Sequence, residues 1–315
     1  MRIKGIIGKN ERDTAICDYN RKVAFIMPGQ GKYDLETVNL LYYRNRNINE
    51  KFKDEQNRKI IDYLLNKKDG EDLSNIDLQS IIYISNIVIS MMLINNGIHP
   101  DALAGFSAGE ISALAIGGAF SVDEGLRIIT NRAKLMQLDI DKRESMMVAV
   151  FNIKKEVIEN ICLKIENVYI ANINSPYQIV LALEKKEYKR VKSLVYLEGG
   201  KLIPLNLAGG FHSKFFGNAA RAFYESIEKV DIEIPIINTY SNYTGNVYND
   251  RIKYLMAKQV DNRVEWQKEI MQMKEDGITC FIETSVYCKL SSLIQETISD
   301  VEVINYKKIE ELMKI

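Results

Sequence analysis

Residues 102–110 have the sequence ALAGFSAGE, in which a short apolar run leads into a serine between two glycines. The apolar run predicts a buried strand, and the residues from 108 onward predict a helix. A G-x-S-x-G segment between a strand and a helix is typical of a nucleophile elbow, a sharp turn that holds the serine side chain clear of the backbone. The glycines remove side chains that would clash there. The pattern therefore indicates Ser107 as a nucleophile, with a helix-capping serine in a small-residue turn as the alternative.

Apolar runs and helical periodicity around this segment predict a chain that alternates strands with helices. Strands are expected at 23–28, 278–284 and 301–306, surface helices within 33–70, and further helices at 74–96, 108–118 and 122–140.

A different pattern occupies the middle of the chain. Strands are predicted there at 146–152, 167–173, 177–183 and 201–207, and helices at 154–166 and 185–199. This order is typical of a ferredoxin-like subdomain. We therefore predict an α/β fold in which a small subdomain, residues 141–207, interrupts a large domain formed by residues 23–140 and 208–315. Residues 1–22 are expected to be a polar leader.

The composition is that of an ordinary folded protein and argues against several functional classes. Of the 315 residues, 46% are hydrophobic, and 42 basic residues balance 42 acidic ones. A net charge of zero argues against a chain-wide nucleic-acid surface or a polybasic membrane patch, so we expect neither partner. The most apolar stretch, 81–94, contains polar residues and is too short to span a bilayer, so a buried helix is expected. The N-terminal residues lack the apolar region of a secretory signal.

The few cysteines and histidines limit which metal sites and which catalytic bases the chain can have. Four scattered cysteines without a C-x-x-C pair favour a reducing cytoplasm and no structural zinc. Only two histidines are available as a base for Ser107. His99 precedes the predicted strand, whose length keeps it roughly 20 Å from Ser107. His212 lies where the chain returns from the small subdomain, and clefts form at such junctions. We therefore expect His212 to be the base, with a buried structural histidine as the alternative.

Six segments, taken together, resemble one family. They are MPGQG (27–31), GFSAGE (105–110), NRAKLMQ (131–137), NINSPYQIV (172–180), GGFHS (209–213) and KQVDNRVEW (258–266). In this order they resemble the malonyl-CoA:acyl-carrier-protein transacylases, whose pattern the acyltransferase domains of polyketide synthases share. The resemblance implies an α/β-hydrolase-like large domain with an inserted ferredoxin-like subdomain, in agreement with the predicted elements.

The resemblance also implies catalytic roles. Ser107 would be the acylated nucleophile and His212 its base. The backbone carbonyl of Gln259 would orient the histidine. The backbone amides of Gln30 and Ala108 would form the oxyanion hole.

Two further residues would select the substrate. Arg132 would hold the malonyl carboxylate in a two-pronged salt bridge, because a guanidinium matches a carboxylate. Phe211 resembles the bulky residue of malonyl-selective relatives. The alternatives are a solvated helix arginine and an ordinary core phenylalanine. The sequence also departs from the family pattern, because Phe106 stands where a histidine is usual.

The implied reaction is ping-pong transfer of a malonyl group from malonyl-CoA to the phosphopantetheine thiol of an acyl carrier protein, without a metal or other cofactor. Four alternatives stay open. They are a stand-alone polyketide synthase acyltransferase, a hydrolase of acyl carrier proteins, a simple serine esterase and a non-catalytic module that binds carrier protein.

Overall fold

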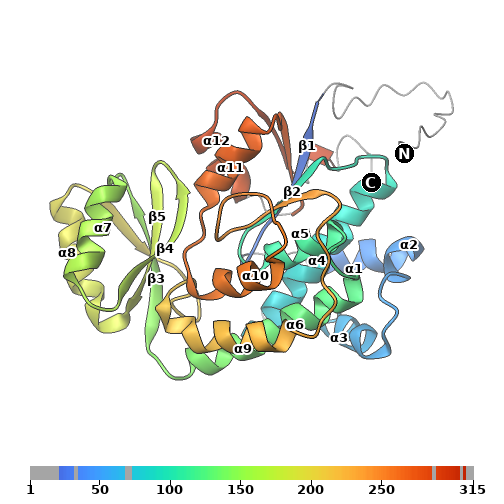
Figure 1. The fold of residues 1–315 in the computed structure, drawn as a ribbon, viewed down its shortest axis with the longest axis horizontal. Helices are drawn as coiled ribbons and strands as arrows, with labels where there is room; N and C mark the ends of the chain where they lie inside the picture. The colour runs from blue at the N-terminus through green and yellow to red at the C-terminus, as the bar shows by residue number, and fades with distance from the viewer. Residues whose placement is uncertain (1–20, 32–34, 68–72, 286–288, 306–307, 310–315) are drawn as a thin grey trace.

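The computed structural model describes residues 21–31, 35–67, 73–285, 289–305 and 308–309. Most of the predicted leader, residues 1–22, lies outside these ranges. Within them the chain forms a larger and a smaller lobe, each built on one sheet (Figure 1). The predicted α/β fold with an inserted antiparallel subdomain is confirmed, whereas the exact boundaries at 141 and 207 stay predictions.

The larger lobe contains a five-stranded sheet. Its strand order is β7 (Asn238–Tyr240), β2 (Ala102–Gly105), β1 (Val23–Met27), β8 (Cys280–Glu283) and β9 (Glu302–Asn305), and every neighbouring pair is parallel. The carboxyl ends of all five strands therefore lie at the same edge, where open α/β sheets bind their ligands. The sequence analysis missed β7, because its three residues are too few to show a periodicity.

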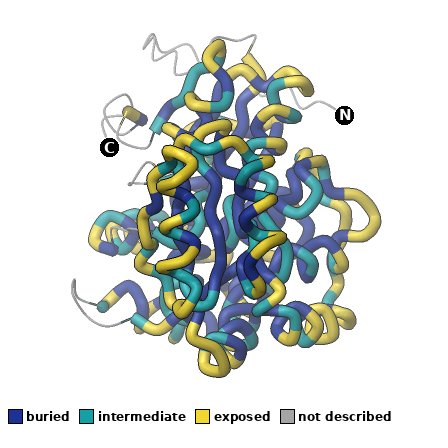
Figure 2. The backbone as a smooth tube through the Cα atoms, turned by 90° about the vertical axis from the view of Figure 1, so that its left-hand side faces the viewer, coloured by how far each residue is buried: buried dark blue, intermediate teal, exposed yellow. Residues whose placement is uncertain are grey.

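Alternate residues of β1 face two different helix layers. Val23, Phe25 and Met27 belong to the core that includes α4 (Asn75–Asn95) and α5 (Gly109–Ile116). Ala24 and Ile26 belong to the core that includes α11 (Trp266–Glu275) and α12 (Leu290–Thr297). The sheet is thus covered on both faces, as parallel sheets require. Figure 2 shows the result, with buried backbone running through the middle and exposed residues on the outer helices.

The remaining helices of the larger lobe are α1 (Leu35–Arg44), α2 (Arg46–Asn49), α3 (Glu55–Leu65), α6 (Val122–Ile140), α9 (Gly217–Ile227) and α10 (Ile252–Asp261). Among them, α1, α2, α3 and α6 pack against α4, whereas α9 packs against α6 and α10. Ser74 and Asp77 form a capping box at the start of α4, and Gly97, with φ +85°, follows its end. The whole of α4 extends beyond the apolar stretch 81–94, and by length and composition alone it is long enough to cross a membrane. Most of it is buried in the protein, as the predicted core helix should be.

The smaller lobe has the predicted ferredoxin-like topology. Its strands are β3 (Ser145–Phe151), β4 (Val168–Ser175), β5 (Gln178–Glu184) and β6 (Lys201–Pro204), in the antiparallel order β4-β5-β3-β6, with helices α7 (Lys155–Lys164) and α8 (Tyr188–Leu197). Val264, before α11, pairs with the edge of β4: its carbonyl accepts from Ile173 at 2.9 Å, and its amide donates to Ala171 at 2.9 Å. These bonds attach the small sheet beside the larger lobe.

Candidate active site

Ser107 occupies a strained turn between β2 and α5. Its φ of +54° lies in the left-handed region, which residues other than glycine rarely adopt. A Cβ at Gly105 would lie 2.1 Å from the backbone of Gly109, and a Cβ at Gly109 would lie 2.1 Å from the Met27 carbonyl oxygen. Only glycine fits at these two positions, which confirms the predicted steric reason for the motif. Ala108 is the capping residue of α5 and no side chain caps the helix, so the alternative of a capping serine is wrong.

The Ser107 hydroxyl contacts a histidine that lies 105 residues further along the chain. Ser107 Oγ lies 2.7 Å from His212 Nε2, and His212 Nδ1 lies 2.8 Å from the Gln259 carbonyl oxygen. Because a carbonyl oxygen can only accept, Nδ1 carries the proton and Nε2 is left to accept from the serine. This is the geometry of a nucleophile, a base and a group that orients the base. His99 is exposed and precedes β2, at the end opposite Ser107.

The surroundings of His212 keep its imidazole neutral. Burial and the positive charge of Arg132 lower the pKa of His212 to about 3, against the raising effect of the Gln259 carbonyl. At neutral pH the ring is therefore a proton acceptor. The Gln259 carbonyl also stabilises the imidazolium that forms when the ring takes up the serine proton.

Three side chains that the sequence analysis did not assign lie beneath the turn. Asn242 Oδ1 accepts from the Ser107 amide at 2.7 Å, and Asn242 Nδ2 donates to Glu269 Oε1 at 2.8 Å. The backbone amide of Asn242 donates to Glu110 Oε1 at 2.7 Å. Burial raises the pKa of Glu110 to about 8. Burial and the neighbouring Glu110 raise the pKa of Glu269 well above its ordinary value.

Arg132 lies in the interior, against α4 and α10. Its Nη1 donates to Gln79 Oε1 at 2.5 Å and its Nη2 donates to Gln259 Oε1 at 2.8 Å. The residue is 2% exposed, so the alternative of a solvated helix arginine is wrong. Burial lowers the pKa of Arg132 to about 10, and the Glu110 charge opposes this shift. The guanidinium therefore remains charged at pH 7.

Ser107 and His212 open into a cavity of about 390 Å³ between the lobes. Both lobes supply walls, among them Gln30, Phe106, Met147, Asn172, Gln178, Val180, Leu205, Phe211 and Leu293. The cavity is mostly apolar with a few converging polar groups, as small-molecule sites usually are. Phe211 packs against Phe216 at a ring distance of 5.1 Å while lining the cavity, so it is both a core and a wall residue. Arg132 is not among the described lining residues.

Two backbone amides lie beside the turn. A Cβ at Gly29 would lie 2.4 Å from the Phe106 carbonyl oxygen, so the loop that carries Gln30 packs directly against the turn. Ala108 caps α5, at the positive end of the helix. Among the described residues, neither the Ala108 amide nor the Gln30 amide donates to another backbone group. Their role as an oxyanion hole stays a prediction.

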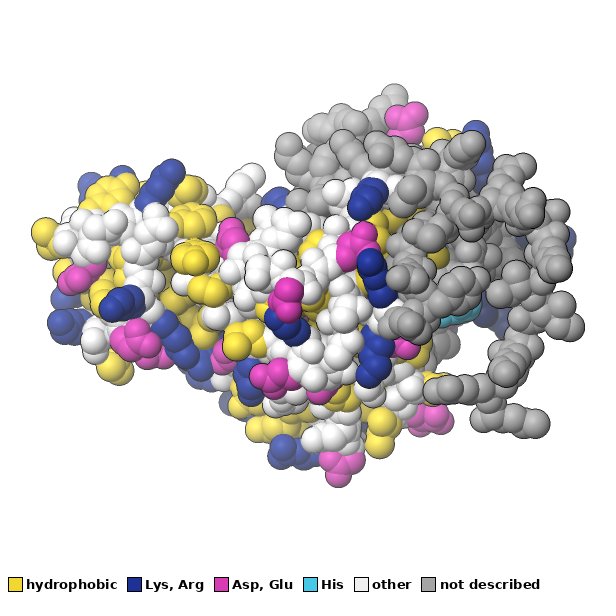
Figure 3. Space-filling view, turned by 90° about the horizontal axis from the view of Figure 1, so that it is seen from above, with side chains coloured by type: hydrophobic (Ala, Val, Ile, Leu, Met, Phe, Trp, Pro, Cys, Tyr) yellow, Lys and Arg dark blue, Asp and Glu magenta, His cyan; other side chains and the backbone are white. Residues whose placement is uncertain are grey.

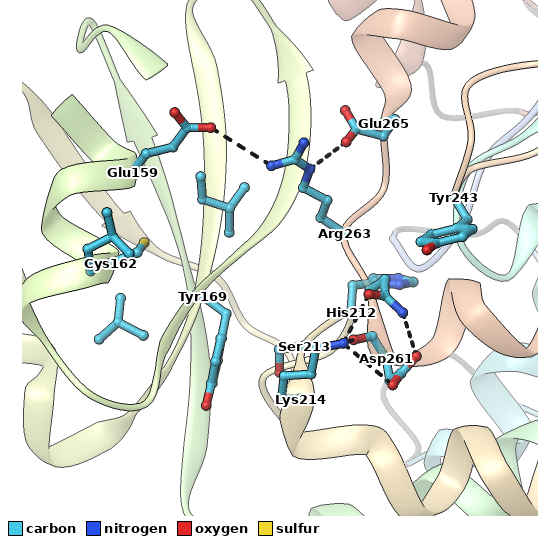
Figure 4. A pocket seen from close by; sticks show the side chains of 14 residues that line it. Glu159, Cys162, Tyr169, His212, Ser213, Lys214, Tyr243, Asp261, Arg263 and Glu265 are labelled. Carbon is cyan, nitrogen blue, oxygen red and sulfur yellow. Dashed lines mark hydrogen bonds and ion pairs between the residues drawn. The ribbon is translucent and has the colours of Figure 1, made fainter. Parts of the chain in front are cut away.

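A larger cavity, of about 750 Å³, lies on another side of His212 (Figure 4). Its charged groups are already paired. Arg263 lies 3.9 Å from Glu159 of α7 and also contacts Glu265, and Lys214 lies 3.7 Å from Asp261. Because Ser107 does not line it, we place the reaction in the smaller cavity.

Charged side chains of both signs are mixed on one face of the molecule. On the face seen in Figure 3, basic and acidic side chains are interspersed, consistent with the zero net charge. Among the residues that the structure describes, no group of three or more His, Cys, Asp and Glu side chains could hold a metal ion. The expectation that no metal is needed stays a prediction.

Comparison with known proteins shows the family of this chain. The model of the acyl transferase domain matches residues 43–314. This chain belongs to the acyl transferase domain family. The malonyl CoA-acyl carrier protein transacylase of Bacillus subtilis is 28% identical over 87% of this chain and 90% of its own length. The polyketide biosynthesis malonyl CoA-acyl carrier protein transacylase BaeC of Bacillus velezensis is 28% identical over 89% of this chain and 98% of its own.

Solved structures show the same fold. The malonyl CoA-acyl carrier protein transacylase from Clostridium perfringens superposes on this acyl transferase with a TM-score of 0.86 and 28% identity, covering 93% of this chain and 96% of the other. MCAT from Streptococcus pneumoniae gives a TM-score of 0.85 and 27% identity, covering 93% and 100%.

Proposed function

We propose that this acyl transferase moves a malonyl group from malonyl-CoA to the phosphopantetheine thiol of an acyl carrier protein through a malonyl ester of Ser107. The observation that carries the proposal is the 2.7 Å contact between Ser107 Oγ and His212 Nε2 in a chain of this family. The names of the relatives from Bacillus species, which are transacylases for malonyl-CoA and acyl carrier protein, support the choice of donor and acceptor.

In the first half-reaction Ser107 Oγ attacks the thioester carbonyl while its proton passes to His212 Nε2. The amides of Ala108 and Gln30 stabilise the oxyanion of the tetrahedral intermediate. Collapse of this intermediate breaks the carbon–sulfur bond, and the CoA thiolate leaves with the proton from His212. In the second half-reaction the carrier's thiol gives its proton to His212 and its sulfur attacks the acyl-serine. The ester bond to Ser107 then breaks, and Ser107 Oγ leaves with the proton from His212. The donor thioester is already activated for attack, and we propose that the transfer uses no metal or redox cofactor.

Arg132 provides the charge that a malonyl group needs. A carboxylate taken into a closed cavity is costly to bury without a partner. The Arg132 guanidinium is charged and buried, and its two observed acceptors are the neutral side-chain oxygens of Gln79 and Gln259. The malonyl carboxylate would displace these oxygens and accept from the guanidinium in their place. Phe211 would limit the space for a branched methylmalonyl group.

A transferase and a hydrolase can be distinguished by whether the malonyl group ends up on the carrier protein or as free malonate. Purified protein is mixed with malonyl-CoA and a carrier protein that bears phosphopantetheine, and the carrier is weighed by mass spectrometry. We expect malonyl-carrier protein to form, and a carrier without the phosphopantetheine arm to stay unchanged as the matched control. Release of CoA and free malonate at the same rate with either carrier would instead identify a hydrolase. Relatives named for polyketide biosynthesis support a carrier of that pathway as readily as one of fatty-acid synthesis, and the cytoplasm is the proposed location.

A further inference from the structure

Asn242 connects the nucleophile turn to the sheet through all four of its polar groups. Its Oδ1 accepts from the Ser107 amide at 2.7 Å, and its Nδ2 donates to the Gly105 carbonyl at 2.6 Å. Its backbone amide donates to Glu110, and its carbonyl accepts from the Glu265 amide at 2.8 Å. The residue is fully buried. Asn242 therefore joins the last residue of β2 to the nucleophile, across the turn itself.

The backbone of Ser107 needs such support. A residue other than glycine in the left-handed region persists only where its surroundings hold it there. The Ser107 amide is held by Asn242, and the Ser107 carbonyl accepts from Gln259 Nε2 at 2.7 Å. Two side-chain amides, Asn242 just after β7 and Gln259 in α10, thus hold both sides of the residue. The next amide along the chain, that of Ala108, is positioned by the same backbone.

The orientation of the Asn242 side chain is determined by its neighbours. Oδ1 faces two donors, the Ser107 amide and Gln259 Nε2 at 3.3 Å. Nδ2 faces two acceptors, the Gly105 carbonyl and Glu269 Oε1. A reversed amide would place donor against donor and acceptor against acceptor, leaving buried groups unpaired. Of these four neighbours, Gly105 and Ser107 belong to the turn and Gln259 to α10. Glu269 lies apart from them, in α11.

We propose that Asn242 is a positioning residue that holds Ser107 in its left-handed conformation, and that Glu269 holds the side chain of Asn242 in the required orientation. The inference rests on the proposed function in one respect, which is that Ser107 is the nucleophile.

The test measures the reactivity of Ser107 separately from malonyl transfer. A fluorophosphonate probe labels an activated serine without needing malonyl-CoA or a carrier protein. For Asn242→Ala we expect the second-order labelling rate and kcat to fall about 10- to 100-fold, the scale of a displacement near 1 Å, while KM for malonyl-CoA changes about twofold or less. Glu269→Gln keeps the acceptor for Asn242 Nδ2 and should stay within about twofold of wild type, whereas Glu269→Leu should resemble Asn242→Ala.

Thr239→Val is the matched control, because Thr239 is a buried polar residue of β7 whose hydroxyl donates to the Ile237 carbonyl at 2.9 Å. Wild-type labelling of folded Asn242→Ala, or an equal loss in Thr239→Val, would overturn the proposal. If Asn242→Ala does not fold, the two Glu269 variants decide, and equal labelling rates for Gln and Leu would overturn it. Wild-type protein that is labelled but transfers no malonyl group would instead refute the proposed function alone.

Discussion

The two ends of β2 have different surroundings, although the strand is only four residues long. At the amino end His99 is exposed, and Asp101 accepts from the Val23 amide at 2.8 Å in an ordinary strand-edge contact. At the carboxyl end Ser107 has a left-handed backbone and contacts the buried His212. Each end has a histidine nearby, so a histidine alone does not mark a reactive site. Buried polar groups that are hydrogen-bonded around a strained residue do mark it.

Of the substitutions considered, replacing His212 should have the largest effect on malonyl transfer. His212→Ala removes the base while leaving the fold, and general-base catalysis contributes about 10²- to 10⁴-fold. We expect kcat/KM for malonyl transfer to fall by that factor, measured by transfer to the carrier protein. Thermal unfolding of the variant checks that the protein remains folded. Nearly full activity in a folded His212→Ala protein would show that His212 is not the base, and would contradict the claim that only the carboxyl end of β2 is reactive.

Arg132→Ala should reduce malonyl transfer selectively. Leaving a buried charge without its partner costs about 3–5 kcal/mol, which corresponds to a loss of at least about 10²-fold for malonyl-CoA. Acetyl-CoA carries no carboxylate and should be spared or improved. The measurement is kcat/KM for malonyl-CoA, acetyl-CoA and methylmalonyl-CoA with wild type and variant. Equal losses for malonyl and acetyl groups would assign Arg132 a structural role only.

Lowering the pH should reduce the free energy of unfolding of the protein through His212, which lies at the carboxyl end of β2. The pKa of His212 is about 3 in the folded protein and 6.5 ordinarily, so the unfolded chain binds the extra proton between these values. The stabilising contribution of the neutral ring is therefore present above pH 6.5 and lost as the pH falls toward 3, by at most about 1.4 kcal/mol per pH unit. Urea denaturation of wild type and His212→Ala at several pH values measures it. A difference in unfolding free energy that is constant with pH would contradict this prediction.

The smallest effect is expected at the amino end of β2. His99→Ala should change kcat/KM about twofold or less, because exposed residues away from a site usually contribute little. The same transfer assay measures it, with His212→Ala alongside. A loss in His99→Ala comparable to that in His212→Ala would show that the assignment of His212 as the base is wrong.

The sequence predicted the elements around Ser107 because their signals are local. The apolar run of β2, the two glycines and the helix α5 all lie within 15 residues of one another. His212 could be chosen because the chain has only two histidines. These predictions needed no knowledge of contacts between distant segments.

The contacts beneath the turn could not be predicted in the same way. Asn242 and Ser107 are 135 residues apart, and Asn242 and Glu110 are 132 apart. Nothing in a buried asparagine or glutamate signals its partner in the sequence. The one available signal was position, because Asn242 follows a strand that lies beside β2 in the parallel sheet. That signal was lost when the three-residue strand β7 was missed.

The mass of the protein after brief mixing with malonyl-CoA tests the central claim most directly. A malonyl ester on Ser107 adds the mass of one malonyl group, and peptide mapping places it on the residue. The account predicts this adduct in the wild type, its absence in Ser107→Ala, and its disappearance when a carrier protein with a free phosphopantetheine thiol is added. An adduct that persists in folded Ser107→Ala would place the nucleophile elsewhere and contradict the account.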